Sequence, residues 1–220
     1  MEQALKRAPQ EPEWHAIAGM FYDKEGQYED AGKHLELALR YRPRNPEYWQ
    51  TLGNIKVKEK DYHAAKDYFA KAIDLFPDNA EALASLAQIN QQLGDHKVAL
   101  EALDKARHLQ PDNPEFLEMA VSNHLAQQNF KVALSTAEEG LKRFANSQQL
   151  IEGKIAALIG LNRAADAQQV ISAAKQMVPD PIPLELLSVQ LAAGNNANLG
   201  YQQAKKLADS YPDSVSVLNL

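Results

Sequence analysis

The chain has 220 residues, of which 45% are hydrophobic and 24% charged, and its formal net charge is −6. This composition is typical of a folded globular chain. The acidic balance argues against nucleic-acid binding, which needs clustered Lys and Arg. The absence of cysteine excludes disulfides and thiolate zinc sites. The longest apolar run, at residues 155–159, is far below the roughly 20 residues of a membrane span, and residues 1–10 lack a secretion signal, so we expect no direct membrane insertion.

Prolines and small residues recur along the chain every 34 residues. Pro43, Pro77 and Pro111 keep this interval, and Pro179 lies two intervals beyond Pro111. One series of alanines keeps the same interval: Ala31, Ala65, Ala99, Ala133 and Ala167. Small side chains at fixed positions let two helices approach closely, and bulky residues between them fill the remaining space. The pattern predicts a repeated pair of packed helices.

In chain order, we expect repeats at about residues 12–45, 46–79, 80–113, 114–147, 148–180 and 181–214. In the second repeat, Asn45 is expected to cap a helix that begins at Pro46. The helix should break around residues 59–61, and a second helix should run from about Tyr62 to Phe76. Turn-forming residues predict similar breaks at 25–27, 93–95, 127–129, 162–163 and 194–196.

The two ends of the sequence continue the same pattern. Residues 1–11 match the tail of a preceding repeat, and residues 215–220 match the start of a further one. An array normally ends in polar caps. We therefore expect an excised segment of a longer array, with apolar ends that could drive end-to-end self-association.

These residues resemble the tetratricopeptide repeat (TPR) family, most closely over residues 46–79. The matching residues there are Trp49, Leu52, Gly53, Ala65, Phe69, Ala72 and Pro77. The fourth to sixth repeats match the family pattern less well. In the fourth repeat, Val121, Gly140 and Ala145 stand where the family usually has other residues. The resemblance implies an all-α fold, an α-solenoid of helix-turn-helix hairpins forming a right-handed superhelix, as a single solenoid over residues 1–220.

Catalytic and metal-binding patterns are absent from the sequence. The six histidines are scattered without the paired spacing of helical zinc enzymes, and neither a Gly-x-Ser-x-Gly elbow nor a glycine-rich loop after a strand is present. We expect no enzyme activity, no metal and no cofactor. Acidic residues precede lysines by four positions in Glu29–Lys33, Asp67–Lys71, Glu101–Lys105 and Glu138–Lys142, a spacing typical of solvated helix faces.

The resemblance also implies a binding groove, because in this family the first helix of each hairpin lines the concave surface where peptides lie. Carried onto this sequence, the candidate groove residues are Glu47, Gln50, Asn54, Glu81, Gln88, Gln91, Glu115, Glu118, Ser122 and Glu152, with Glu185 continuing the acidic trend. Such a surface favours a basic or amide-rich ligand. The alternative for Glu47, Glu81 and Glu115 is that the helix dipole alone favours a carboxylate in a first turn.

The leading hypothesis is a protein-interaction scaffold, bacterial in origin, that binds a protein or peptide. One alternative is a periplasmic scaffold of an envelope system for polysaccharide export, pilus assembly or surface-protein sorting, so the cytoplasm and the periplasm both remain open. Others are the recognition region of a larger enzyme, or a purely architectural spacer. The clamp of basic residues with which some family members bind chaperone tails is disfavoured, because only Asn54 matches it.

Overall fold

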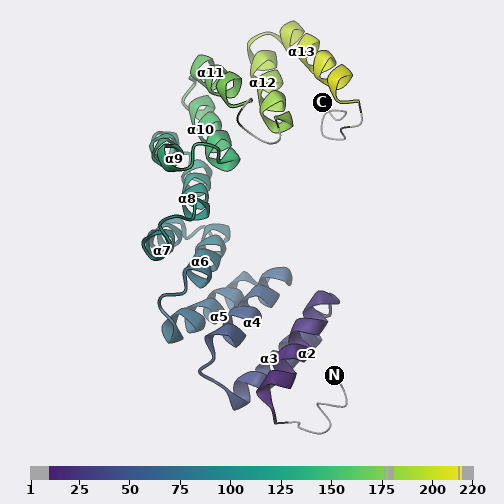
Figure 1. The fold of residues 1–220 in the computed structure, drawn as a ribbon, viewed down its shortest axis with the longest axis vertical. Helices are drawn as coiled ribbons and strands as arrows, with labels where there is room; N and C mark the ends of the chain where they lie inside the picture. The colour runs from purple at the N-terminus through teal and green to yellow at the C-terminus, as the bar shows by residue number, and fades with distance from the viewer. Residues whose placement is uncertain (1–9, 176, 178–180, 213, 215–220) are drawn as a thin grey trace. The chain divides into compact units, whose positions relative to one another are not determined.

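The structure, a computed structural model, describes residues 10–175, 177, 181–212 and 214, and over these residues the chain is helical with no strand (Figure 1). The helices are α2 (Pro12–Lys24), α3 (Tyr28–Tyr41), α4 (Pro46–Lys58), α5 (Tyr62–Leu75), α6 (Ala80–Gln92), α7 (His96–Leu109), α8 (Glu115–Ala126), α9 (Phe130–Arg143), α10 (Gln148–Gly160), α11 (Ala164–Ala174), α12 (Ile182–Asn195) and α13 (Ala197–Ser210). The predicted all-α fold is confirmed. Repeat fragments were expected at residues 1–11 and 215–220; residues 1–9 and 215–220 lie outside the described residues, as does Pro179.

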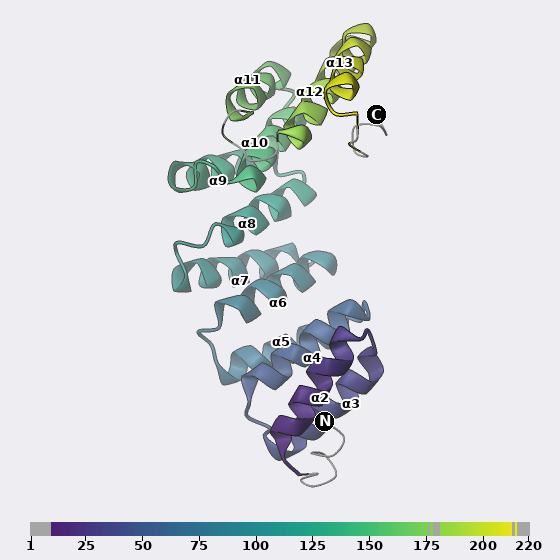
Figure 2. The same cartoon turned by 45° about the vertical axis from the view of Figure 1, so that its right-hand side comes forward.

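Two compact units make up the chain, Met1–Phe116 and Leu117–Leu220. The first contains α2 to α7, arranged as three antiparallel hairpins that Figure 2 shows from a second side. The second contains α9 to α13 and nearly all of α8. Within each unit, the most extensive contacts join a helix to the next one along the chain. Such contacts are typical of repeat arrays, in which each hairpin buries its apolar face against its neighbours.

Helix starts follow the capping residues of the sequence. The Asn45 side chain accepts a hydrogen bond from the Glu47 backbone N–H at 2.9 Å, which confirms the predicted start of α4 at Pro46. Asn79 does the same for α6, accepting from the Ala82 N–H at 2.9 Å. Each cap satisfies a backbone donor that the helix itself leaves unpaired.

The turn inside each of the first five hairpins contains one residue in the left-handed conformation. These residues are Gly26 (φ 74°), Lys60 (φ 61°), Gly94 (φ 83°), Gln128 (φ 58°) and Asn162 (φ 57°), and each follows the previous one by 34 positions. Glycine adopts this conformation freely. For the three other residues it raises the conformational free energy by about 1–3 kcal/mol each. The turns predicted around these positions are confirmed.

Small residues of the repeat lie where two helices meet. Ala31, Ala65 and Ala99 are fully buried in α3, α5 and α7. Gly53 of α4 faces the ring of Phe69 in α5 so closely that a Cβ atom on the glycine would lie 2.9 Å from the ring. The bulky ring fills the space that the glycine leaves open, as the repeat pattern predicted.

Ion pairs on the surface agree only in part with the expected spacing. Lys33 pairs with Glu29 at 2.7 Å, as predicted. Glu138 of α9 pairs with Lys154 of α10 at 3.1 Å, and Lys97 approaches Glu101 at 3.9 Å. Sequence spacing within one helix missed the Glu138 pair because the lysine belongs to a different helix.

Candidate functional site

Exposed polar residues occupy matching positions on the first helices of the first unit. Glu47 and Asn54 of α4 correspond to Glu81 and Gln88 of α6, and all four side chains are exposed. A separation of seven residues places both members of each pair on the same face of their helix. The first unit therefore presents an acidic and amide-bearing face on two successive first helices.

Glu115 and Gln91 lie at the edges of this set. Glu115 is exposed in the first turn of α8, where its backbone N–H is bound by the Asn113 side chain at 3.0 Å. Gln91 is half-buried near the end of α6. Because Glu115 lies in a first turn, its favourable interaction with the helix dipole is enough to explain a carboxylate at this position.

Two other predicted groove residues form hydrogen bonds between hairpins. The Gln50 side-chain oxygen accepts from the Asn79 amide at 2.9 Å, and the Ser147 hydroxyl donates to Glu118 at 2.6 Å. In both cases a residue of one first helix binds the N-cap residue of the next first helix, 29 positions later. Gln50 and Glu118 thus tie successive hairpins together.

The remaining predicted residues lie in the second unit. Glu152 of α10 is half-buried and accepts from the Gln148 side chain at 2.9 Å, within its own helix. Ser122 of α8 is exposed. Glu185, at the start of α12, approaches Lys175 at 3.7 Å. These acidic groups already have polar partners inside the unit.

Exposed apolar residues on α2 were missed by the sequence reasoning. Trp14, Ile17, Met20 and Phe21 are 39%, 49%, 46% and 49% exposed. Met20 holds the position that Asn54 and Gln88 hold in the next two hairpins. That correspondence was an available signal for Met20, because an apolar residue stands where the next two hairpins have polar ones. The exposure of Phe21 had no such signal, since Phe21 occupies the position of Ile55 and Ile89, which are buried in α4 and α6. An exposed apolar group of this kind is typical of an interaction surface.

A histidine pair joins α2 to α3 beside this apolar group. The Nδ1 atoms of His15 and His34 lie 3.2 Å apart, and the His34 ring stacks on Tyr22 with centroids separated by 5.3 Å. Burial lowers the pKa of His34, the neighbouring His15 lowers it further, and Asp30 opposes both effects. The neutral form of His34 is favoured, so the pair packs as part of an aromatic cluster.

Across the described residues, no group of three acidic, cysteine or histidine side chains could hold a metal ion.

Solved structures show the same fold. PilW, a widely conserved type IV pilus biogenesis factor, is 18% identical with a TM-score of 0.73, over 94% of this chain and 97% of that one. The pilF protein of Pseudomonas aeruginosa is 19% identical with a TM-score of 0.69, over 94% and 95%. YrrB, a TPR protein with an unusual peptide-binding site, is 17% identical with a TM-score of 0.66, over 83% and 94%. At these identities the likeness establishes the fold alone. A search of curated proteins gave no match.

Packed hairpins that recur every 34 residues, with a capped first helix and a left-handed turn residue, define a TPR protein with an all-α solenoid fold. More narrowly, the chain belongs to the family of the cytochrome c-type biogenesis protein H TPR domain, whose model matches residues 24–149. TPR domains are in general protein-interaction scaffolds, and their function depends on the surface that they present. No helix among the described residues is long and apolar enough to span a membrane.

Proposed function

We propose that the chain holds a partner polypeptide on the first-helix surface of its first unit. The partner would place apolar side chains against Ile17 and Met20 of α2, and basic or amide side chains beside Glu47 and Glu81. The observation that carries this proposal is the shared position of Met20, Asn54 and Gln88, which are all exposed in successive hairpins. A ligand that follows these helices would meet an apolar end and an acidic end.

The family indicates what kind of polypeptide this would be. Its description, cytochrome c-type biogenesis protein H, supports a role in the assembly of c-type cytochromes. We infer that the partner is a polypeptide handled during that assembly, held before or while it folds. Such assembly favours the periplasmic alternative over the cytoplasmic one.

The apolar end and the acidic end of the proposed surface would contribute to binding in different ways. Burial of the exposed apolar side chains of α2 would supply most of the affinity, at about 25 cal/mol per Å² of apolar area removed from water. The carboxylates of Glu47 and Glu81 are exposed, so they would contribute to encounter rate and to partner choice more than to final affinity. The charge contribution should therefore weaken as salt is added.

Binding to a haem-free cytochrome c polypeptide tests the partner class directly. We expect the full chain to bind this polypeptide in fluorescence anisotropy, and to bind its folded, haem-containing form more weakly. Equal binding to both forms, or binding to neither, would contradict the proposal.

A charge-matched pair of variants tests the surface. The double variant Glu47→Gln/Glu81→Gln removes two charges from first helices, and Glu36→Gln/Asp67→Asn removes two exposed charges from second helices of the same unit. We expect only the first variant to weaken binding and to reduce its salt dependence. Equal effects from both would mean that net charge, and not this surface, controls binding.

A further inference from the structure

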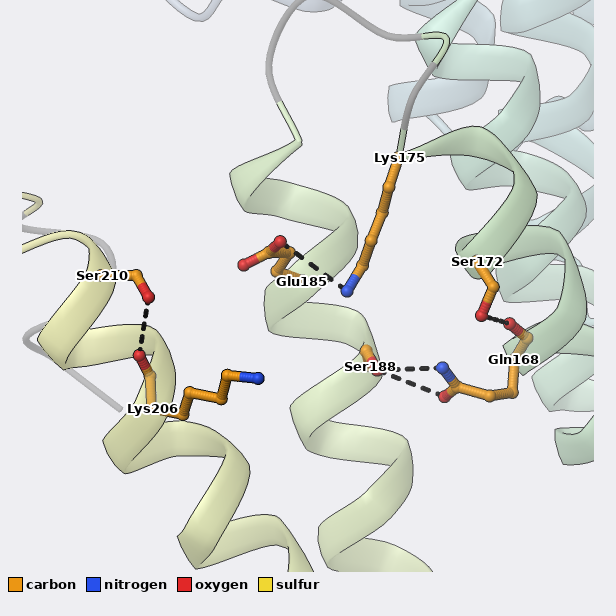
Figure 3. A network of polar contacts seen from close by, with 7 residues as sticks. All are labelled: Gln168, Ser172, Lys175, Glu185, Ser188, Lys206 and Ser210. Carbon is orange, nitrogen blue, oxygen red and sulfur yellow. Dashed lines mark hydrogen bonds and ion pairs between the residues drawn. The ribbon is translucent and has the colours of Figure 1, made fainter.

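The second unit contains a polar cavity of about 390 Å³ between α11, α12 and α13. Figure 3 shows polar side chains that the three helices direct toward one another there. This volume is at the lower end of the range of ligand sites, which is about 300–1,000 Å³. The cavity therefore suits a small group or a single amino-acid residue more than an extended chain.

Hydrogen bonds hold one wall of the cavity in place. The Gln168 amide nitrogen of α11 donates to the Ser188 hydroxyl oxygen of α12 at 3.0 Å. Ser188 in turn donates to the Gln168 side-chain oxygen at 3.3 Å, while on α13 the Ser210 hydroxyl donates to the Lys206 backbone oxygen of its own helix at 2.9 Å. The reciprocal Gln168–Ser188 contact fixes α11 against α12, so this wall of the cavity is preorganised.

The charges that line the cavity do not cancel. Lys175 approaches Glu185 at 3.7 Å, so these two groups offset each other in part. Lys206 also lines the cavity, and Figure 3 shows its side chain extending from α13 toward α12. No ion pair joins Lys206 to another described residue. Among the described lining residues there are two ammonium groups and one carboxylate, so their sum is a net positive charge in a chain whose net charge is −6.

The other described residues that line the cavity are uncharged. Gln203 and Tyr211 add neutral hydrogen-bond donors, while Val189 and Leu207 form an apolar floor and are only 7% and 5% exposed. One uncompensated ammonium group with neutral donors suits a monoanion, because a doubly charged phosphate would leave excess negative charge in the site. An apolar floor suits a ligand with a short hydrocarbon part next to its anionic group.

We propose that this cavity is a binding site for a carboxylate, with the Lys206 ammonium pairing to it and Gln203 and Tyr211 donating hydrogen bonds. The carboxylate could belong to the C-terminus of a peptide or to a small organic acid, which share this chemistry. The site lies in the second unit and uses α11 and α13, which are second helices. It is therefore separate from the first-helix surface proposed above, and each can fail without the other.

Matched ligands and neighbouring lysines test the site in the full chain. The probes are a short peptide with a free C-terminal carboxylate, the same peptide amidated at its C-terminus, the monocarboxylate butyrate, and inorganic phosphate. Binding is read from amide chemical shifts of the residues that line the cavity. Lys206→Gln removes the proposed partner, and Lys205→Gln removes the exposed lysine next to it on α13, which does not line the cavity. Circular dichroism checks that both variants fold.

We expect the free-acid peptide to shift these signals, the amidated peptide to bind at least several-fold more weakly, and Lys206→Gln alone to reduce binding. Stronger binding of butyrate than of the peptide would support the site and assign it to a free organic acid. Equal loss in the two lysine variants, equal binding of the two peptides, or tighter binding of phosphate than of butyrate would overturn the proposal.

Discussion

The role of a small residue in packing depends on whether a bulky side chain lies next to it. Gly53 is buried against Phe69, whereas Gly32 of α3 has no heavy atom within 4 Å of the place where a Cβ would stand. The sequence predicts the first relationship, since both residues belong to the 34-residue pattern. It does not predict the second, because Gly32 lies outside the pattern and only the coordinates reveal the open space.

The two glycines should respond to alanine in opposite directions. Gly53→Ala is expected to lower the free energy of unfolding by about 1–3 kcal/mol, because the new methyl group meets a ring that is fully buried. Gly32→Ala should raise it by about 0.5–1 kcal/mol, because alanine is the better helix former. Urea unfolding monitored by tryptophan fluorescence measures both. A gain for Gly53→Ala would show that Phe69 moves easily.

Successive first helices are linked by a polar contact that recurs in the chain. Gln50 bonds to Asn79, and Glu118 bonds to Ser147, at equivalent positions two repeats apart. From the sequence, Asn45 was predicted as a cap but Asn79 and Ser147 were not, and Gln50 and Glu118 were placed in a groove. Partners 29 residues away cannot be identified from helical spacing, so this part of the site needed the structure.

A double-mutant cycle on Gln50 and Asn79 should reveal this link. Asn79→Ala is expected to cost about 0.5–2 kcal/mol as a lost helix cap, and the pair should show a coupling of about 0.5–1.5 kcal/mol for the shared hydrogen bond. Asn45→Ala, which removes the cap of α4, is the control and should not couple to Gln50→Ala. Additive effects at Gln50 and Asn79 would mean that their contact does not contribute to stability.

At the scale of the whole chain, the fold class and most helix positions followed from one repeated interval. The division into two compact units did not, because the interval continues through the boundary at residues 116–117 without a change. Both tryptophans, Trp14 and Trp49, belong to the first unit, while helices lie in both. Fluorescence therefore reports on one unit, and circular dichroism reports on the whole chain.

This difference allows the units to be followed separately during unfolding. Ile155→Ala in the second unit removes a fully buried side chain and should cost about 2–5 kcal/mol. We expect it to shift part of the circular dichroism transition and to leave the fluorescence transition nearly unchanged. Leu52→Ala, fully buried in the first unit, should shift the fluorescence transition. If Ile155→Ala moved both transitions equally, the chain would unfold as one cooperative body.

The preference of each helix for its immediate neighbours in the chain also bears on how the protein is made. During synthesis, a hairpin that has left the ribosome already has its own second helix and the preceding hairpin to pack against. It need not wait for a distant segment, because the contacts that stabilise it are close in sequence. Newly made apolar faces are thus covered in the order of translation, which shortens the time during which they could aggregate.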